Sequence, residues 1–434
     1  MADRTDEDID GFFTTARVSG REEAVLLGEA SFRDYLYEHD HESLAPWRGM
    51  TYEEFTAARQ DNPFLQQLLA DWNALYDEEF VGVTSDGVVQ EALYTLPPEG
   101  SADPALVGAA RRLVDALDDT GRAAAMHALD ARQWRAWSNP EFVFHRVGIR
   151  LEDHSDDVVE HVHELLRAAL SPEGYQQVRE AMELNGFLGE LVDLPSIMNE
   201  RSYWFSFFGT PSIDEPWGFQ IFGHHLALNF LTVGGREVIA PVFIGAEPAL
   251  SDDARRPIFD TREKTAVTLA SSLNPEQRAK AVVYPSVLDP TMPEGRLHPA
   301  DERHVAGAFR DNRVVPYEGI PVTELDRRQR ALLREIVEDF HLLLASPERA
   351  ATMGEYDAHL DETWFSWYGA TDGSEPIYFR VHSPVILAEL DNHAGVWLSN
   401  TLPARFHVHS TLRHPNGNDY GRALLAQWRA RRDR

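Results

Sequence analysis

Two pairs of side chains near the end of the chain could hold a metal ion. Glu389 and Asp391 lie two residues apart in VILAELDNH, and His407 and His409 lie two apart in RFHVHS. Side chains two apart on a β-strand share a face. If these segments are neighbouring antiparallel strands, two carboxylates and two imidazoles meet on one face. That is a suitable ligand set for a divalent ion of Zn, Mn, Fe or Cu.

A third imidazole comes from the G-H-H segment that contains His224 and His225. Adjacent residues on a strand face opposite sides, so only one of the two histidines is expected to bind. The repeat described below pairs Asn229 with Glu389 and thereby favours His225, although a β-bulge in the segment would favour His224 instead. The predicted metal ligands are His225 or His224, Glu389, His407 and His409.

Three residues have predicted catalytic roles. Glu389 or Asp391, when not bound to the metal, would act as a general base. Arg413 follows the H-x-H pair and could bind a substrate carboxylate or phosphate through two parallel hydrogen bonds. Pairing with one of the many acidic residues is the alternative for Arg413. His393 continues the face of Glu389 and Asp391 and could also reach the site.

An internal repeat organises the rest of the chain. WFSFFGTPSIDEPWGF from Trp204 and WFSWYGATDGSEPIYF from Trp364 share seven identities in sixteen ungapped positions, at an offset of 160 residues. LSPEGYQQV from Leu170 resembles LDRRQRALL from Leu325. So long a period predicts two copies of a domain-sized unit rather than a solenoid. The predicted divisions are a mainly helical region with a short strand pair over 1–100, a first half over 101–250 and a second half over 251–434.

The predicted elements indicate an α+β fold. FQIFGHHLALNFLTV, a Gly-Gly turn and EVIAPVFIG are typical of a β-hairpin, and IYFRVHSPVILAELD with ARFHVHSTL is its counterpart. Residues 21–40 and 51–75 have helical periodicity, whereas residues 80–96 predict two short strands around a Ser-Asp-Gly turn. We therefore expect two pseudo-symmetric halves with helices packed on mostly antiparallel sheets.

Composition restricts the classes of function. The chain has 434 residues and no cysteine, which excludes disulfides, Fe–S clusters and cysteine-bound zinc. A net charge of −31 disfavours binding to nucleic acid or to anionic membranes. The acidic start lacks the pattern of a secretory signal, and no apolar run approaches about 18 residues. We expect a cytoplasmic protein that acts on a small molecule, with homodimerisation left open.

The combined motifs resemble a widespread bacterial and fungal family described only as a domain of unknown function. The similar segments are GHHLALN, PVFIGAEP, YFRVHSPVILAELDNH, RFHVHS and PNGNDYG, from about Phe80 to the C-terminus. Leu390 stands where the family more usually has an aromatic residue, and Val408 stands where it has Ile. Both lie between proposed ligands and leave the ligand pattern intact. The resemblance implies no particular activity.

Three functions are compatible with these residues. The first is a metal-dependent hydrolase that activates a water molecule for attack on a small polar substrate. The second is an O₂-dependent oxidoreductase, because histidine and carboxylate sets also hold non-haem iron, and histidines hold copper. The third is a non-catalytic binding protein with a structural metal, for which a closed four-ligand set would be expected.

Overall fold

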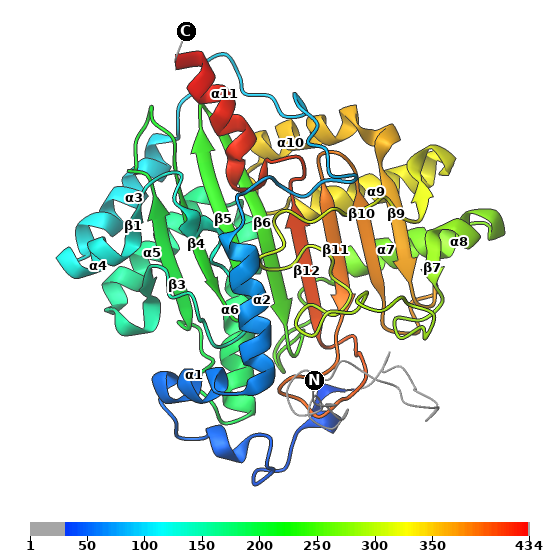
Figure 1. Cartoon of the computed structure of the whole chain (residues 1–434), viewed down its shortest axis with the longest axis horizontal. Helices are drawn as coiled ribbons and strands as arrows, with labels where there is room; N and C mark the ends of the chain where they lie inside the picture. The colour runs from blue at the N-terminus through cyan, green and yellow to red at the C-terminus, as the bar shows by residue number, and fades with distance from the viewer. Residues whose placement is uncertain (1–30, 433–434) are drawn as a thin grey trace.

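The protein is built around one large mixed β-sheet with helices and irregular segments on its faces (Figure 1). The computed structural model describes residues 31–432. The strands are β1 (Met126–His127), β2 (Ile149–Arg150), β3 (Tyr203–Phe208), β4 (Trp217–Gly223), β5 (Leu226–Val233), β6 (Arg236–Ala246), β7 (Val282–Tyr284), β8 (Ile320–Pro321), β9 (Trp364–Tyr368), β10 (Tyr378–His382), β11 (Leu387–Asn392) and β12 (Val408–Arg413). The helices are α1 (Tyr52–Gln60), α2 (Pro63–Asp77), α3 (Pro104–Ala116), α4 (Asp119–Ala125), α5 (Asp156–Ala169), α6 (Pro172–Leu191), α7 (Asp260–Ser272), α8 (Pro275–Ala281), α9 (Arg327–Phe340), α10 (Ser346–Ala358) and α11 (Arg422–Arg432).

The sheet confirms the predicted α+β class. Its strand order is β1-β3-β4-β5-β6-β12-β11-β10-β9-β7, with β2 pairing with β3 and β8 pairing with β9. All pairs are antiparallel except those of β1 with β3 and of β7 with β9. The two halves of the chain join at the antiparallel pair of β6 and β12, where Val408 lies opposite Ala246 and Leu412 opposite Val242. The halves therefore share one continuous sheet.

The same order of elements occurs on both sides of this junction. It runs α3-α4-β1-β2-α5-α6-β3-β4-β5-β6 in the first half and α7-α8-β7-β8-α9-α10-β9-β10-β11-β12 in the second. In this order α5 corresponds to α9. The predicted sequence match of Leu170 with Leu325 was therefore wrong, because it aligned the start of α6 with the start of α9. A shared pattern of capped helix starts produced it. The origin of the halves by duplication stays a prediction.

In each predicted hairpin, the first predicted strand is two strands joined by a short turn. Gly234 and Gly235 do form the turn between β5 and β6, with positive φ values of 56° and 78°. The stretch before them, however, is two strands, because His224 and His225 turn the chain between β4 and β5. In the second half, residues 383–386 separate β10 from β11 in the same way.

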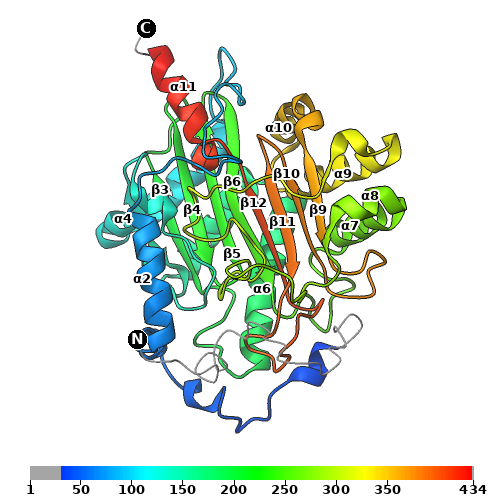
Figure 2. The same ribbon diagram turned by 45° about the vertical axis from the view of Figure 1, so that its right-hand side comes forward.

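Helices cover one face of the sheet. In Figure 1, α3, α5 and α6 lie behind one half of the sheet, and α7, α9 and α10 lie behind the other. Figure 2 shows α7 and α9 beside β9 after the molecule is turned. Their apolar residues recur at helical spacing, as in α5, where Val158, Val162 and Leu166 are buried. The start of α9 is fixed by a capping box in which the Asp326 side chain accepts the N–H of Gln329. In the described part of the chain, no helix is both long and apolar enough to cross a membrane.

Irregular chain, together with α2 and α11, covers the opposite face (Figure 1). The predicted strand pair over 80–96 was wrong, since residues 78–103 contain no strand and only one isolated bridge, between Thr84 and Val314. Val88 is 65% exposed, so the apolar residues of this segment do not form a buried strand face. The helix expected over 21–40 lies partly outside the described residues. Its described end holds only a short 3-10 helix, Phe32–Tyr35.

We expect Phe219→Ala to lower the free energy of unfolding by about 3–5 kcal/mol. The Phe219 ring is fully buried and stacks on Phe230 and Phe205, with ring centroids 4.9 and 5.7 Å away, so truncation leaves a cavity at the centre of the first half. Urea unfolding followed by circular dichroism measures the loss. The exposed substitution Val88→Ala should change stability little, and equal losses in both variants would contradict this account.

Candidate metal centre

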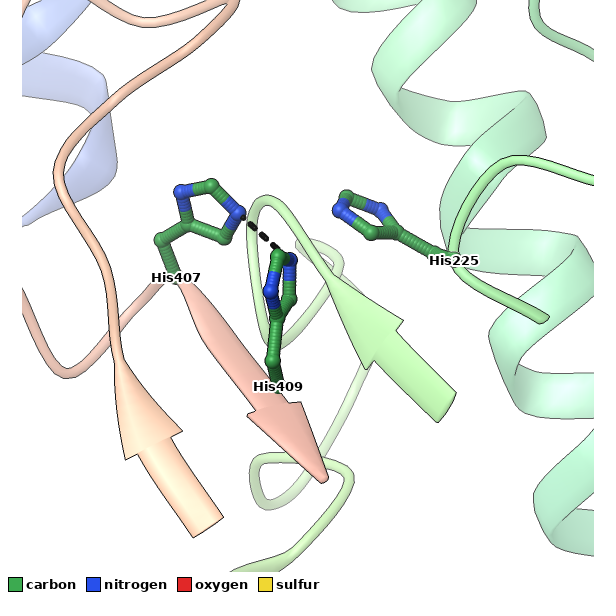
Figure 3. A group of neighbouring side chains, drawn as sticks. All are labelled: His225, His407 and His409. Carbon is green, nitrogen blue, oxygen red and sulfur yellow. Dashed lines mark hydrogen bonds between the residues drawn. The ribbon is translucent and has the colours of Figure 1, made fainter. Parts of the chain in front are cut away.

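Three imidazoles converge at the junction of the two halves (Figure 3). His225 belongs to the turn before β5, His407 immediately precedes β12, and His409 lies within β12. Each offers one ring nitrogen, and the three ligand atoms lie within 4.8 Å of one another. All three residues are at least 96% buried. We refer to this set as the histidine triad.

The spacing within the triad suits a common divalent metal. The Nε2 atoms of His407 and His409 are 3.1 Å apart. Two metal–nitrogen bonds of about 2.0–2.1 Å at a tetrahedral angle would separate the two nitrogens by roughly 3.3–3.4 Å. A direct hydrogen bond between the two rings is the other arrangement that this distance allows.

His407 is held by the backbone of the loop that precedes it. Its Nδ1 lies 2.6 Å from the carbonyl oxygen of Ala394, to which it donates a hydrogen bond. This bond fixes the tautomer, so the lone pair of Nε2 faces the other two imidazoles. The loop is itself anchored by the buried Glu247 carboxylate, which accepts the N–H groups of Val396, Trp397 and Leu398 at 2.8–3.1 Å.

A glycine makes room for the other two rings. Gly245 of β6 lies opposite His409, and its N–H donates to the carbonyl oxygen of His225 at 2.9 Å. A Cβ atom at position 245 would lie 2.6 Å from Cδ2 of His409 and 2.9 Å from Cδ2 of His225. Any other residue would therefore push both imidazoles out of place.

The turn that presents His225 has a strained backbone. His225 has a φ of 62°, in the left-handed region that favours glycine. Its N–H donates to Oδ1 of Asn139 at 3.2 Å, which helps to hold the turn. Such a conformation costs about 1–2 kcal/mol, and strain of this kind is concentrated at functional sites.

Burial keeps two imidazoles of the triad uncharged. It lowers the pKa of His225 and His409 well below 6.5, and the neighbouring imidazoles lower both values further. These two rings are therefore neutral at pH 7, the form in which imidazole binds metals.

His224 lies beside the triad and is not part of it. Its ring stacks on that of His225 with centroids 3.8 Å apart, and its Nδ1 lies 2.9 Å from Oδ1 of Asn185. Burial lowers its pKa to about 4. Strand alternation was the wrong reason for preferring His225, because both histidines lie in a turn.

The triad lines a small cavity of about 30 Å³. This volume has room for about two water molecules. Half-buried residues, among them Asn139, Pro299 and Val396, form part of its wall. A larger cavity of about 890 Å³ lies under α11, and no histidine of the triad lines it. The complete lining of the smaller cavity is Asn139, Pro140, Glu141, His224, His225, Pro299, Ala300, Glu302, His393, Ala394, Gly395, Val396, His407 and His409.

Glu389 and Asp391 lie on the same sheet face as His409. Strands β11 and β12 are antiparallel neighbours, and Asp391 lies opposite His409. The structure does not, however, bring Glu389 to the triad as a ligand. Its carboxylate accepts the N–H groups of Val305 and Ala306, at 2.9 and 3.2 Å, and the Tyr378 hydroxyl at 2.6 Å. Glu389 thus binds the backbone that covers the sheet.

Asp391 is bound by the same covering segment, which contains residues 303–307. Its Oδ1 accepts a hydrogen bond from Nε of Arg303 at 2.6 Å, and its Oδ2 accepts the Arg303 N–H at 3.2 Å. Both side chains are completely buried. Neither Glu389 nor Asp391 lines the cavity at the triad.

Arg413 does not face a substrate site. Its guanidinium is fully buried and donates to the carbonyl oxygens of Ala306 and Gly307 at 2.9 and 2.5 Å, and to Asp311 and Asp419 at 2.6 and 3.1 Å. All three side-chain nitrogens are thus engaged within the protein. The predicted binding of a substrate anion by Arg413 disagrees with this geometry, because the strand directs the side chain beneath the covering segment.

A second group of possible ligands, His304, Asp391 and His393, adjoins the triad. The sequence indicated His393 as a neighbour of the site but not His304, nor Glu302 in the cavity wall. His304 and Glu302 come from irregular chain between β7 and β8, where no periodicity predicts which residues face inward. The only sequence feature that could have indicated His304 is that it is a single histidine among charged residues.

A family model described as "Protein of unknown function (DUF3500)" matches residues 99–422. This range covers both halves of the sheet. No curated protein and no solved structure matches the chain significantly.

We expect Arg413→Ala to lower the free energy of unfolding by about 3–5 kcal/mol, because it leaves the Asp311 carboxylate without one of its buried cationic partners. Chemical denaturation measures the change. Arg112→Ala, which removes a surface ion pair with Glu164, is the matched control and should cost much less. A stable Arg413→Ala protein would contradict a structural role for this residue.

Proposed function

The chain belongs to the DUF3500 family of unknown function, and we propose from its site that it is a metal-dependent hydrolase acting on a small polar substrate. The metal would be bound by His225, His407 and His409. The observation that carries the proposal is the convergence of three buried imidazoles beside a cavity of water size. Catalytic zinc sites commonly have three protein ligands and one position left for water. A metal bound here would lower the pKa of that water to about 7.

Glu302 is the carboxylate best suited to accept a proton in this cavity. It lines the cavity wall, and burial raises its pKa to about 7, although the adjacent Arg303 opposes the shift. A general base is most effective when its pKa lies near the working pH. The Ala394 N–H donates to Oε1 of Glu302 at 2.9 Å and fixes the side chain. Glu302 thus takes the role that the sequence suggested for Glu389 or Asp391.

The size of the cavity supports a small substrate. About 30 Å³ admits only the reacting group, so the remainder of the substrate would lie near the half-buried Pro299 and Val396. The buried Arg59–Glu141 ion pair stands behind one wall, with side chains 4% exposed, and adds a polar boundary.

An O₂-dependent oxidoreductase is the second candidate. The observation that favours it is that the triad consists of imidazoles, which also bind copper and iron. Metal identity separates the two chemistries. Zinc has no redox activity and supports hydrolysis, whereas iron or copper supports reaction with oxygen.

We expect one equivalent of metal or more per chain in protein purified without a His-tag, and loss of the triad metal in the double variant His407→Ala, His409→Ala. Mass spectrometry of the metal content measures both. His39→Ala, whose side chain is 82% exposed, is the control and should retain the metal. Zinc or manganese, with metal-dependent cleavage of p-nitrophenyl acetate or p-nitrophenyl phosphate, supports the hydrolase. Iron or copper supports the oxidoreductase, and no metal even after reconstitution refutes both.

We expect Gly245→Ala to weaken metal binding about tenfold or more while all three ligands remain, because the added methyl group displaces His409 and His225. Competition with a chromophoric chelator measures the affinity. Gly354→Ala is the matched control, since a Cβ atom there has no neighbour within 4 Å. Unchanged affinity in Gly245→Ala would argue against binding by these two imidazoles together.

A further inference from the structure

A second set of metal donors shares a wall with the histidine triad. His304, Asp391 and His393 each offer one ligand atom, and these atoms lie within 4.8 Å of one another. We infer that they form a second metal site, so that the centre binds two divalent cations side by side. The inference rests on the proposed function, because it extends the same site.

In each histidine of this set, Nε2 lacks a hydrogen-bond partner among the described residues. Nδ1 of His304 lies 2.6 Å from the hydroxyl of Thr411, which leaves Nε2 to face inward. Among the described residues, neither Nε2 of His304 nor Nε2 of His393 has a hydrogen-bond partner, and both residues are at least 97% buried. Buried polar atoms without partners are rare in folded proteins, and a bound ion is one explanation for them. A cation would satisfy both nitrogens.

Asp391 can supply the third ligand without losing its anchoring role. Its Oδ1 is bound by Nε of Arg303, whereas its Oδ2 lies 3.2 Å from Nε2 of His393. These last two atoms are not aligned for a hydrogen bond. Two imidazoles and one carboxylate form a set that suits iron, manganese or zinc.

The charges around this set favour a cation. The Asp391 side chain is fully buried and that of Glu302 is 12% exposed, and both carboxylates contact the single guanidinium of Arg303. When both are ionised, one negative charge remains unbalanced in a buried environment. A divalent cation at His304 and His393 would compensate for it and lower the cost of burial.

The two sets are close enough to act together. The ring of His393 lies 3.8 Å from that of His409 and 5.4 Å from that of His407, measured between centroids. In enzymes with two metals, the ions lie about 3.5–4 Å apart and clamp the attacking and leaving oxygens of a displacement. This arrangement points to substrates with a phosphoryl or carbonyl group, whose oxygens could bridge both cations.

The test is a count of bound Zn²⁺. Chelator-treated protein is reloaded with Zn²⁺, desalted and analysed for metal. We expect about two Zn²⁺ per chain in the wild type and in His39→Ala, and about one in His304→Gln, His393→Gln. The double variant His225→Gln, His407→Gln should also retain about one. Circular dichroism of each metal-free variant establishes that it folds.

A milder variant tests the same site if the double variants do not fold. Thr411→Val removes the partner of His304 and should weaken the second Zn²⁺ about 10- to 100-fold, with the first unchanged. If the wild type binds one Zn²⁺ and the His225→Gln, His407→Gln variant binds none, the second site is overturned and the proposed function stays intact. No Zn²⁺ would overturn both. Equal affinities for the second Zn²⁺ in wild type and Thr411→Val would remove His304 from the site.

Discussion

Buried ion pairs hold the segment that covers the sheet, and the candidate site depends on them. Arg303 pairs with Asp391, and Arg413 with Asp311, all with side chains no more than 1% exposed. Arg413 also donates to the carbonyl oxygens of Ala306 and Gly307. Buried ion pairs contribute little net stability because desolvation offsets their attraction, but losing one partner is costly. They therefore specify where the irregular chain lies, and in doing so they place Glu302 and His304 against the sheet.

The choice of ligand follows from the same restriction on burial. An isolated carboxylate buried in the sheet would need a charged partner. An imidazole can be buried in its neutral form and still present a lone pair. His225, His407 and His409 occur where a turn, a loop and a strand meet at the β6–β12 junction. His225 comes from the first half and the H-x-H pair from the second, so neither half contains the triad alone.

Periodicity predicted the parts of the site that lie on strands. The alternation of Glu389 with Asp391, and of His407 with His409, correctly implied two antiparallel neighbours with one polar face. It could not show that Glu389 is occupied by backbone N–H groups, because those come from a segment about 84 residues earlier in the chain. It also failed for His224 and His225, where the assumption of a continuous strand concealed a two-residue turn.

Two residues of the site, His304 and Glu302, were not predicted from the sequence, and for the same reason. His304 and Glu302 lie in irregular chain, whose conformation is determined by partners distant in sequence rather than by local propensity. Arg413 was predicted to bind a substrate anion because an arginine at a strand end beside histidines can bind a carboxylate or phosphate. In the structure it forms ion pairs with Asp311 and Asp419 instead. A charged side chain near a metal pocket is thus equally suited to building the pocket. The hydrogen-bond partners of each polar atom distinguish a residue that builds the pocket from one that binds a ligand. All three side-chain nitrogens of Arg413 have partners within the protein, whereas Nε2 of His304 and Nε2 of His393 have none among the described residues.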